Sequence, residues 1–120
     1  HNQWVFFGMY SFILFIAIMK AHLFYRVIRL LSKFDPSKPF SNFVSDQITQ
    51  ISYTTFSIGI ISYIGRQIAE SLEHYGYATD NLNPFWTDSQ AFVLMAAVIY
   101  AIAAIFKKGV EIQSENDLTV

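Results

Sequence analysis

The sequence contains no cysteine and little charge, and both absences narrow the class of protein. Without cysteine, the chain cannot form disulfides, thiolate metal sites or cysteine nucleophiles. Charged residues make up 14% of the 120 residues and hydrophobic residues 53%, whereas a typical soluble domain is roughly 25% charged. So few charges cannot cover the surface of a small soluble domain, and so hydrophobic a chain is not intrinsically disordered. A net charge of −1 also lacks the basic footprint of a direct nucleic-acid binder.

Two uncharged apolar runs, residues 4–19 and 91–106, predict membrane-spanning helices. Each run has sixteen residues and covers roughly 24 Å at 1.5 Å per residue, so each must recruit its flanks to cross a hydrocarbon core of ~30 Å. We therefore expect spans over residues 4–24 and 85–106, with Lys20 snorkelling from the inner end of the first.

The segment between these runs is more polar, because serine and threonine are mixed with isoleucine and phenylalanine. We predict a span over residues 46–66, since these hydroxyls can bond back to the helix; a soluble amphipathic helix is the alternative. Small residues recur at i, i+4 and i+7 here and in the last span, which predicts that the two helices pack together. Such residues are also common in any membrane helix. The predicted packing residues are Thr55, Gly59, Ser62, Ala97, Ala101 and Ala104.

The positive charges predict the orientation of the spans. Five lysines and arginines lie between residues 20 and 46, and Lys107 and Lys108 follow the last span, whereas residues 66–90 contain only Arg66. By the positive-inside rule, the basic loop 25–45 and the tail 107–120 are cytoplasmic and the loop 67–84 is outside. Residue 1 then lies outside without an export signal, so we expect a further span before it. The predicted fold is an all-α integral-membrane helical bundle, with residues 1–120 as a single transmembrane domain.

A basic helical extension follows the first span. Arg26, Arg29 and Lys33 lie on one helical face, and Asp35-Pro36 is expected to end the helix near Phe34. This basic face suits anionic lipid at the inner surface, an acidic partner, or the acidic tail of the same chain. Ser41 or Ser45 can then cap the next helix.

No pattern in the sequence indicates catalysis. It lacks a phosphate-binding glycine loop, a nucleophile elbow and facing carboxylates within a span. His22 and His74 are expected at opposite membrane surfaces, and pairing His1 with His74 supplies no third ligand. We therefore predict a non-enzymatic protein without a metal or cofactor.

The most specific patterns are Lys38-Pro39-Phe40-Ser41 and the tail from Phe106-Lys107-Lys108-Gly109 to Glu115-Asn116-Asp117-Leu118-Thr119. Together they resemble the uncharacterised bacterial integral-membrane family catalogued as domain of unknown function number twenty-nine seventy-five. The resemblance implies a small four-span protein, of which this chain carries three spans. It supplies no activity, but genes of the family often lie beside one for a small helix-turn-helix regulator.

The tail carries acidic and apolar residues beyond a pair of lysines, which suits contact with a basic protein surface. The alternative is a solvated tail that folds back on the basic face of residues 26–33. We expect an inner-membrane protein that binds a protein partner through its loop and tail, a helix-turn-helix regulator being one candidate; an accessory subunit of a larger membrane complex is the second hypothesis. The predicted partner-binding residues are Lys107, Lys108, Glu111, Gln113, Glu115 and Asp117.

Overall fold

The computed structural model describes residues 3–76 and 88–118, with the side chains of residues 117 and 118 left out. Within this part the chain forms three helices and no strand: α1 (Gln3–Lys33), α2 (Asn42–His74) and α3 (Ser89–Leu118). The predicted all-α fold is confirmed. Residues 85–87, including Trp86, were predicted to begin the last span and lie outside the described part.

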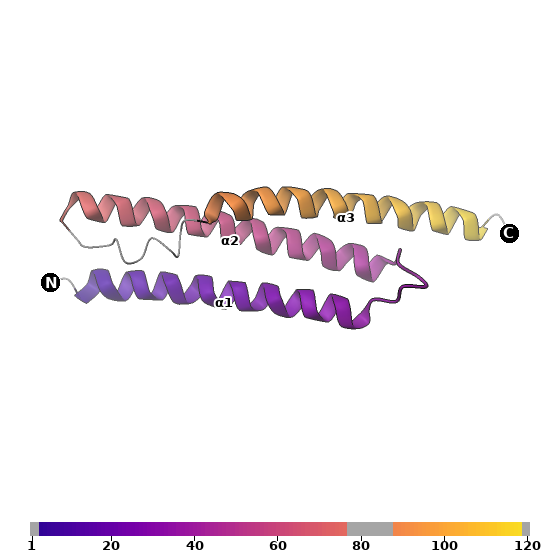
Figure 1. Cartoon of the computed structure of the whole chain (residues 1–120), viewed down its shortest axis with the longest axis horizontal. Coiled ribbons are helices and arrows are strands. Elements are labelled where there is room, and N and C mark those ends of the chain that lie inside the picture. Colours follow the sequence, from indigo (N-terminus) through magenta and orange to yellow (C-terminus); the bar gives the residue numbers. More distant parts are fainter. Residues whose placement is uncertain (1–2, 77–87, 119–120) are drawn as a thin grey trace.

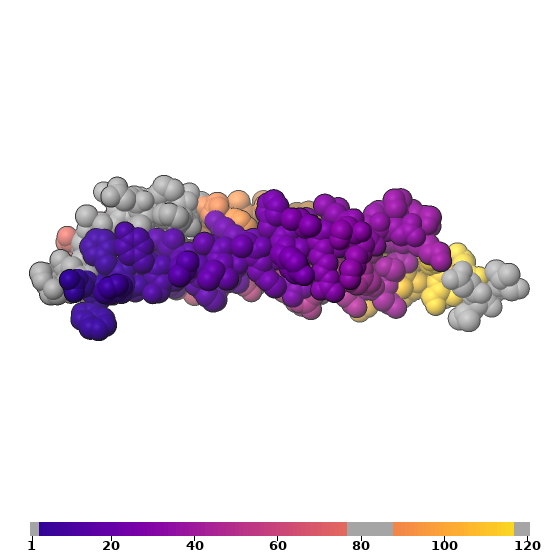
Figure 2. Space-filling model, turned by 90° about the horizontal axis from the view of Figure 1, so that it is seen from below, coloured from indigo at the N-terminus to yellow at the C-terminus, as the bar shows by residue number. Residues whose placement is uncertain are grey.

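The helices lie side by side along one axis and give the molecule a length of 71 Å and a width of 22 Å. α2 is the central helix, because both α1 and α3 pack against it. Figure 1 shows that α3 begins midway along α2 and runs past the N-terminal end of α2. Figure 2 shows α1 covering one face of the molecule, with the C-terminal end of α3 projecting beyond it.

The connection between α1 and α2 is ordered by local hydrogen bonds. α1 ends at Lys33, as the following Asp-Pro pair predicts. The backbone N–H of Ser37 and its Oγ donate to Asp35 Oδ1 at 3.0 and 2.7 Å, and these bonds hold the pKa of Asp35 below its usual value. Ser41 then caps α2, its Oγ accepting from the N–H of Val44 at 3.2 Å. Phe40 is the residue before this cap, so the ordered turn fixes the backbone position of Phe40 at the start of α2.

The two halves of α2 belong to different hydrophobic clusters, and Leu30 of α1 joins α3 in the N-terminal one. Its C-terminal half, with Ile61 and Ala69, meets Met9 and Ile16 of α1. Its N-terminal half, with Val44 and Ile48, meets Ala103 of α3. The two clusters are about 20 residues apart along α2, which is roughly 30 Å. The apolar run of α1 is therefore displaced along the axis from that of α3.

The buried hydroxyl residues of α2 are Ser45, Ser52, Thr55 and Ser62, and two of them, Ser52 and Thr55, donate to carbonyls of their own helix. Thr55 Oγ1 donates to the carbonyl of Ile51 at 2.7 Å, and Ser52 Oγ donates to the carbonyl of Thr49 at 2.7 Å. Thr55 and Ser62 have no exposed surface. The backbone acceptors allow the Thr55 and Ser52 hydroxyls to be buried without a partner from another helix.

Gly59 is the point of closest approach between α2 and α3. A Cβ atom at this position would lie 2.7 Å from Val93 Cγ2 and 3.1 Å from the carbonyl oxygen of Ser89. The predicted packing of these two helices is therefore correct, and Thr55, Gly59 and Ser62 are all buried. The predicted residues of α3 are wrong. The buried alanines are Ala96 and Ala103, whereas the exposed ones are Ala97, Ala101 and Ala104.

The position of Lys20 corrects a second prediction. It was expected at the inner end of the first span and residue 88 near the outer end of the last span, yet Lys20 Nζ lies 3.6 Å from Asp88 Oδ2 and 5.2 Å from the centroid of the Phe92 ring. The reason is that α1 continues unbroken to Lys33, so its apolar side extends well past Lys20. Lys20 thus lies within α1, beside the start of α3, and not at the end of α1.

Replacing Lys20 with alanine is expected to lower the thermal stability of the protein in mild detergent by about 1 kcal/mol, because the ion pair and the ring contact are both lost. The swap of Lys20→Asp with Asp88→Lys should restore the ion pair and part of the loss. Lys38→Ala removes an exposed loop lysine and serves as the control. Equal unfolding temperatures for K20A and K38A would contradict the contact.

Two of the described helices are long and apolar enough to cross a membrane: Gln3–Lys33, and Ser89–Asn116 within α3. The exposed surface of both is strongly apolar, with Trp4 82% and Leu94 68% exposed. These two helices suggest a membrane-spanning protein.

Candidate functional site

The connecting loop and the C-terminal tail meet at one end of the bundle. The ring of Phe40 packs directly on Gly109, where a Cβ atom would come within 2.5 Å of Phe40 Cδ1 and 2.9 Å of its Cγ. The same ring makes an edge contact with Phe106, with 5.5 Å between ring centroids. Only a residue without a side chain allows this approach, so Gly109 allows the loop to pack against α3.

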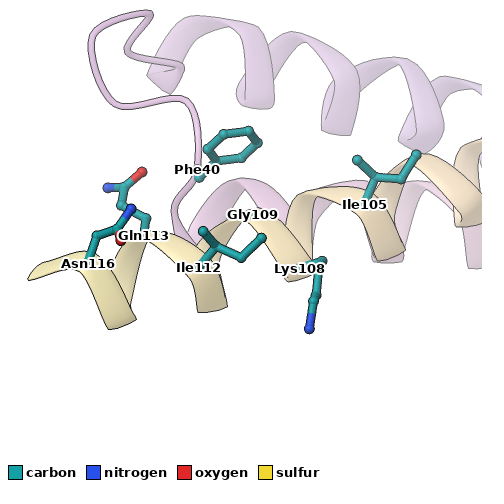
Figure 3. A pocket seen from close by; sticks show the side chains of 7 residues that line it. All are labelled: Phe40, Ile105, Lys108, Gly109, Ile112, Gln113 and Asn116. Carbon is teal, nitrogen blue, oxygen red and sulfur yellow. The ribbon is translucent and has the colours of Figure 1, made fainter. Parts of the chain in front are cut away.

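A groove of about 520 Å³ runs along α3 beside this contact. Figure 3 shows the ring of Phe40 over Gly109, with Ile105 and Ile112 along the same helix and Lys108 pointing away from the ring. Gln113 and Asn116 line its far end. The Ile112 side chain is 49% exposed. The groove therefore offers an apolar floor with amide groups at one end.

The tail continues α3 as a helix to Leu118 and does not fold back on the basic face of α1. Lys108 Nζ pairs with Glu111 Oε2 of the same helix at 3.7 Å. The alternative of a tail folded onto residues 26–33 is therefore wrong. Each residue adds about 1.5 Å to the length of a helix. The side chains of the tail therefore lie progressively farther from α2 along α3.

The structure divides the predicted partner-binding residues into two groups. Lys108 and Gln113 line the groove, and Glu111 lies beside it through its ion pair with Lys108. Lys107 and Glu115 are exposed but do not line the groove. The side chain of Asp117 lies outside the described part.

The basic face of α1 lies at the same end. Arg29 and Lys33 both approach the ring of Phe43, with Arg29 Cζ at 5.9 Å and Lys33 Nζ at 5.6 Å from its centroid. Arg26 Nε instead donates to His22 Nε2 at 3.0 Å, one turn away on α1. The basic face of α1 and the tail are therefore at the same end of the bundle.

Five residues of this site were not among those predicted for partner binding: Phe40, Ile105, Gly109, Ile112 and Asn116. One signal was available, because a glycine inside a helical pattern often marks a close approach of another segment. Nothing in the sequence specified which segment approaches Gly109.

The comparison with known proteins identifies one family. A family model described as "Protein of unknown function (DUF2975)" covers residues 2–120. The chain belongs to this family. The resemblance predicted from the loop and tail is confirmed. No curated protein and no solved structure matches the chain.

In this DUF2975 protein, the contact between Phe40 and Gly109 joins two segments that are distant in the sequence. Phe40 belongs to the loop pattern and Gly109 to the tail pattern that carried the resemblance. These patterns are more than 60 residues apart in the sequence, yet their side chains and backbone form one surface. The two patterns that carried the resemblance thus form a single structural feature of this DUF2975 protein.

Proposed function

We propose that this protein is an inner-membrane helical bundle whose joined loop and tail bind a protein partner, without catalysing a reaction. The proposal has three parts: the membrane location, the orientation and the binding surface. Each is supported by a different observation.

The distribution of polarity supports the membrane location. Four of the five largest fully buried side chains are serines and a threonine, whereas large apolar side chains on all three helices are exposed. A soluble protein has the opposite arrangement. On α2 the exposed side carries Tyr53, Phe56 and Ile60, so α2 presents an apolar surface although its interior is polar. This supports α2 as the third span.

The lengths of the helices support the same location despite the displacement of α1. Leu30 and Ala103 belong to one cluster, so the apolar surface extends from Trp4 to Phe106 over about 29 residues, or ~44 Å. A bilayer with its headgroup regions is ~40–45 Å thick. In this placement Lys20 lies within the membrane, where its pairing with Asp88 lowers the cost of burying a charge.

The positive charges support the orientation. Arg29, Lys33 and Lys107 gather at the end of the bundle where the loop meets the tail, and Lys38 and Lys108 lie in the same two segments. By the positive-inside rule this end faces the cytoplasm. The C-terminus is then cytoplasmic, and the N-terminal end of α1 lies outside.

The contact between Phe40 and Gly109 is the observation that carries the binding proposal, because it makes one surface of the loop and the tail. The groove beside it has the apolar floor that a partner helix can fill, and Glu111 and Glu115 offer negative charge to a basic partner. A small helix-turn-helix regulator has this chemistry and is the candidate partner.

Replacing Ile112 with glutamate is expected to reduce recovery of the partner at least about tenfold, because a charge is placed on the apolar floor of the groove. Copurification from membranes solubilised in mild detergent measures this. Ser114→Glu adds the same charge at an exposed position outside the groove and should leave recovery unchanged. If I112E and a chain lacking residues 107–120 both retain every partner, the binding surface lies elsewhere.

The second hypothesis, an accessory subunit of a larger membrane complex, is supported by a different surface. A groove of about 300 Å³ lies between α2 and α3. Its lining is almost entirely apolar and includes Tyr53, Phe56, Ala97 and Tyr100. This groove faces the lipid in the proposed placement, so another membrane helix can fill it. Recovery of a stable assembly of membrane proteins, unaffected by I112E, would favour this hypothesis.

A further inference from the structure

Two cations converge on one aromatic ring where α1 meets the start of α2. Arg29 Cζ lies 5.9 Å and Lys33 Nζ 5.6 Å from the centroid of the Phe43 ring. The two charges lie one helical turn apart on α1, and Phe43 is half-buried beneath them. Like charges at this spacing repel each other, so the arrangement favours an anion that contacts both.

The described part of the chain does not supply that anion. Ion pairs in this part include Lys20–Asp88, Arg66–Glu70 and Lys108–Glu111, and Arg29 and Lys33 belong to none of these three. On α2 the acid nearest in sequence to Phe43 is Asp46, which is exposed and, among the described residues, forms no ion pair with Arg29 or Lys33 within 4 Å. Asp35, the acid of the connecting loop, accepts hydrogen bonds from Ser37. Both cations are therefore available to a ligand.

The depth of this cluster matches a lipid headgroup. Leu30, next to Arg29, packs in the cluster that contains Ala103 and is bordered by Phe106. Lys107 follows Phe106 on α3, so all these cations lie where the apolar surface of the bundle ends. On the same face of α1 as these cations, toward its N-terminal end, Phe15, Ile18 and Tyr25 are 51%, 58% and 59% exposed. An acyl chain can lie along them while the headgroup reaches the cations.

We propose that Arg29 and Lys33, positioned by Phe43, bind the phosphate of an anionic phospholipid from the cytoplasmic leaflet. The inference rests on the membrane location of the proposed function but not on its protein partner. The lipid is favoured over free phosphate because the apolar surface beside the cations matches the acyl chains. Phe43 contributes by holding the two cations against its ring.

The test titrates the purified full-length chain in neutral detergent with short-chain phosphatidylglycerol, and native mass spectrometry measures the bound lipid. The double variant Arg29→Gln with Lys33→Gln should bind roughly 30-fold more weakly than the unchanged protein, because it loses two charges near the headgroup. Arg29→Lys with Lys33→Arg keeps both charges and should retain binding. Arg66→Gln removes an arginine on the distant C-terminal part of α2 and is the matched control.

Further measurements distinguish an anionic lipid from free phosphate and from a protein partner. Phosphatidylcholine should bind much more weakly than phosphatidylglycerol, and inorganic phosphate should not displace the lipid. Equal binding by the R29Q/K33Q variant, or complete displacement by inorganic phosphate, would overturn the site. Loss of a copurifying protein with unchanged lipid affinity would also overturn it, because the face would then dock a protein. Release of every variant from membranes by alkaline carbonate would instead contradict the membrane location.

Discussion

Replacing Gly59 with leucine is expected to abolish the packing of α3 on α2 and to cost about 3 kcal/mol or more of stability. Overpacking a core commonly costs about 1–3 kcal/mol when neighbouring side chains can move. Here the neighbours include backbone: a Cβ atom would lie 3.0 Å from the N atom of Val93 and 3.1 Å from the carbonyl oxygen of Ser89. Backbone cannot yield unless the helices separate, so the cost falls on the whole interface.

Alanine at the same position gives a sharper test, because it can reverse the sign of the effect. Glycine inside a helix is destabilising by about 0.5–1 kcal/mol relative to alanine, so Gly59→Ala would stabilise a helix that packs loosely. We expect it to destabilise this protein. Gly8→Ala is the matched control, because a Cβ atom at Gly8 meets nothing within 4 Å. It should be neutral or slightly stabilising.

Thermal unfolding in mild detergent measures both glycine variants against the unchanged protein. Val93→Ala in the G59A background removes the contact with Val93 Cγ2 but leaves the backbone contacts, so it should recover only part of the loss. Stabilisation by G59A equal to that by G8A would mean that α2 and α3 do not approach each other at this point.

Replacing Gly109 with leucine is expected to displace the ring of Phe40 and to break the surface shared by the loop and the tail. Unlike Gly59, Gly109 faces a side chain, whose Cδ1, Cε1 and Cγ atoms would lie 2.5, 2.7 and 2.9 Å from an added Cβ atom. The ring can move away at the cost of its edge contact with Phe106, which is worth about 0.5–1.5 kcal/mol. We therefore expect a modest loss of stability but a large loss of partner binding.

A double-mutant cycle separates this contact from a general effect on the helix. In the unchanged background Gly109→Ala should destabilise, because its Cβ atom meets the Phe40 ring. In a Phe40→Ala background the ring is absent, so the same change should stabilise α3 through helix propensity. The expected coupling is about 1–2 kcal/mol. Additive effects would show that the loop and the tail do not touch.

Local sequence signals were reliable where the structure depends on neighbouring residues. α1 ends before the Asp35-Pro36 pair, and Ser41 caps α2, as the sequence predicts. On α2 the small residues mark the packing face because the rest of that helix is bulky or polar, so Thr55 and Gly59 stand out.

The same reasoning failed on α3, where almost every residue is apolar and small residues occur on several faces. Ala96 and Ala103 differ from the predicted alanines by one position, which is a rotation of about 100°. What selects them is the close approach at Gly59, which fixes Val93 and therefore the rotation of α3. That information lies on another helix and is not visible in the pattern of α3 itself.

The position of Lys20 and the meeting of Phe40 with Gly109 could not be predicted for a related reason. A lysine after an apolar run usually marks the end of a span, but here it meets Asp88 because α3 starts midway along the bundle. The displacement of the helices along the axis depends on side-chain packing in both clusters. Sequence patterns can indicate a helix and its apolar side, but they do not set this displacement.

The central claim, that the loop and the tail form one surface, is tested most directly by a disulfide between cysteines at positions 40 and 109. The natural chain has no cysteine, so an engineered pair has no competing thiol. Since the added Cβ atom at position 109 would lie 2.9 Å from Phe40 Cγ, the two Cβ atoms lie at most about 4.4 Å apart, within reach of a disulfide.

Oxidation of F40C/G109C in isolated membranes is predicted to give a rapid disulfide within one chain, seen as a shift of the monomer band that reductant reverses. A chain with cysteines at positions 40 and 76, which flank the two ends of the 33-residue helix α2, should form none under the same conditions. Equal cross-linking of the two pairs, or none in F40C/G109C, would contradict the joined surface on which the proposed function depends.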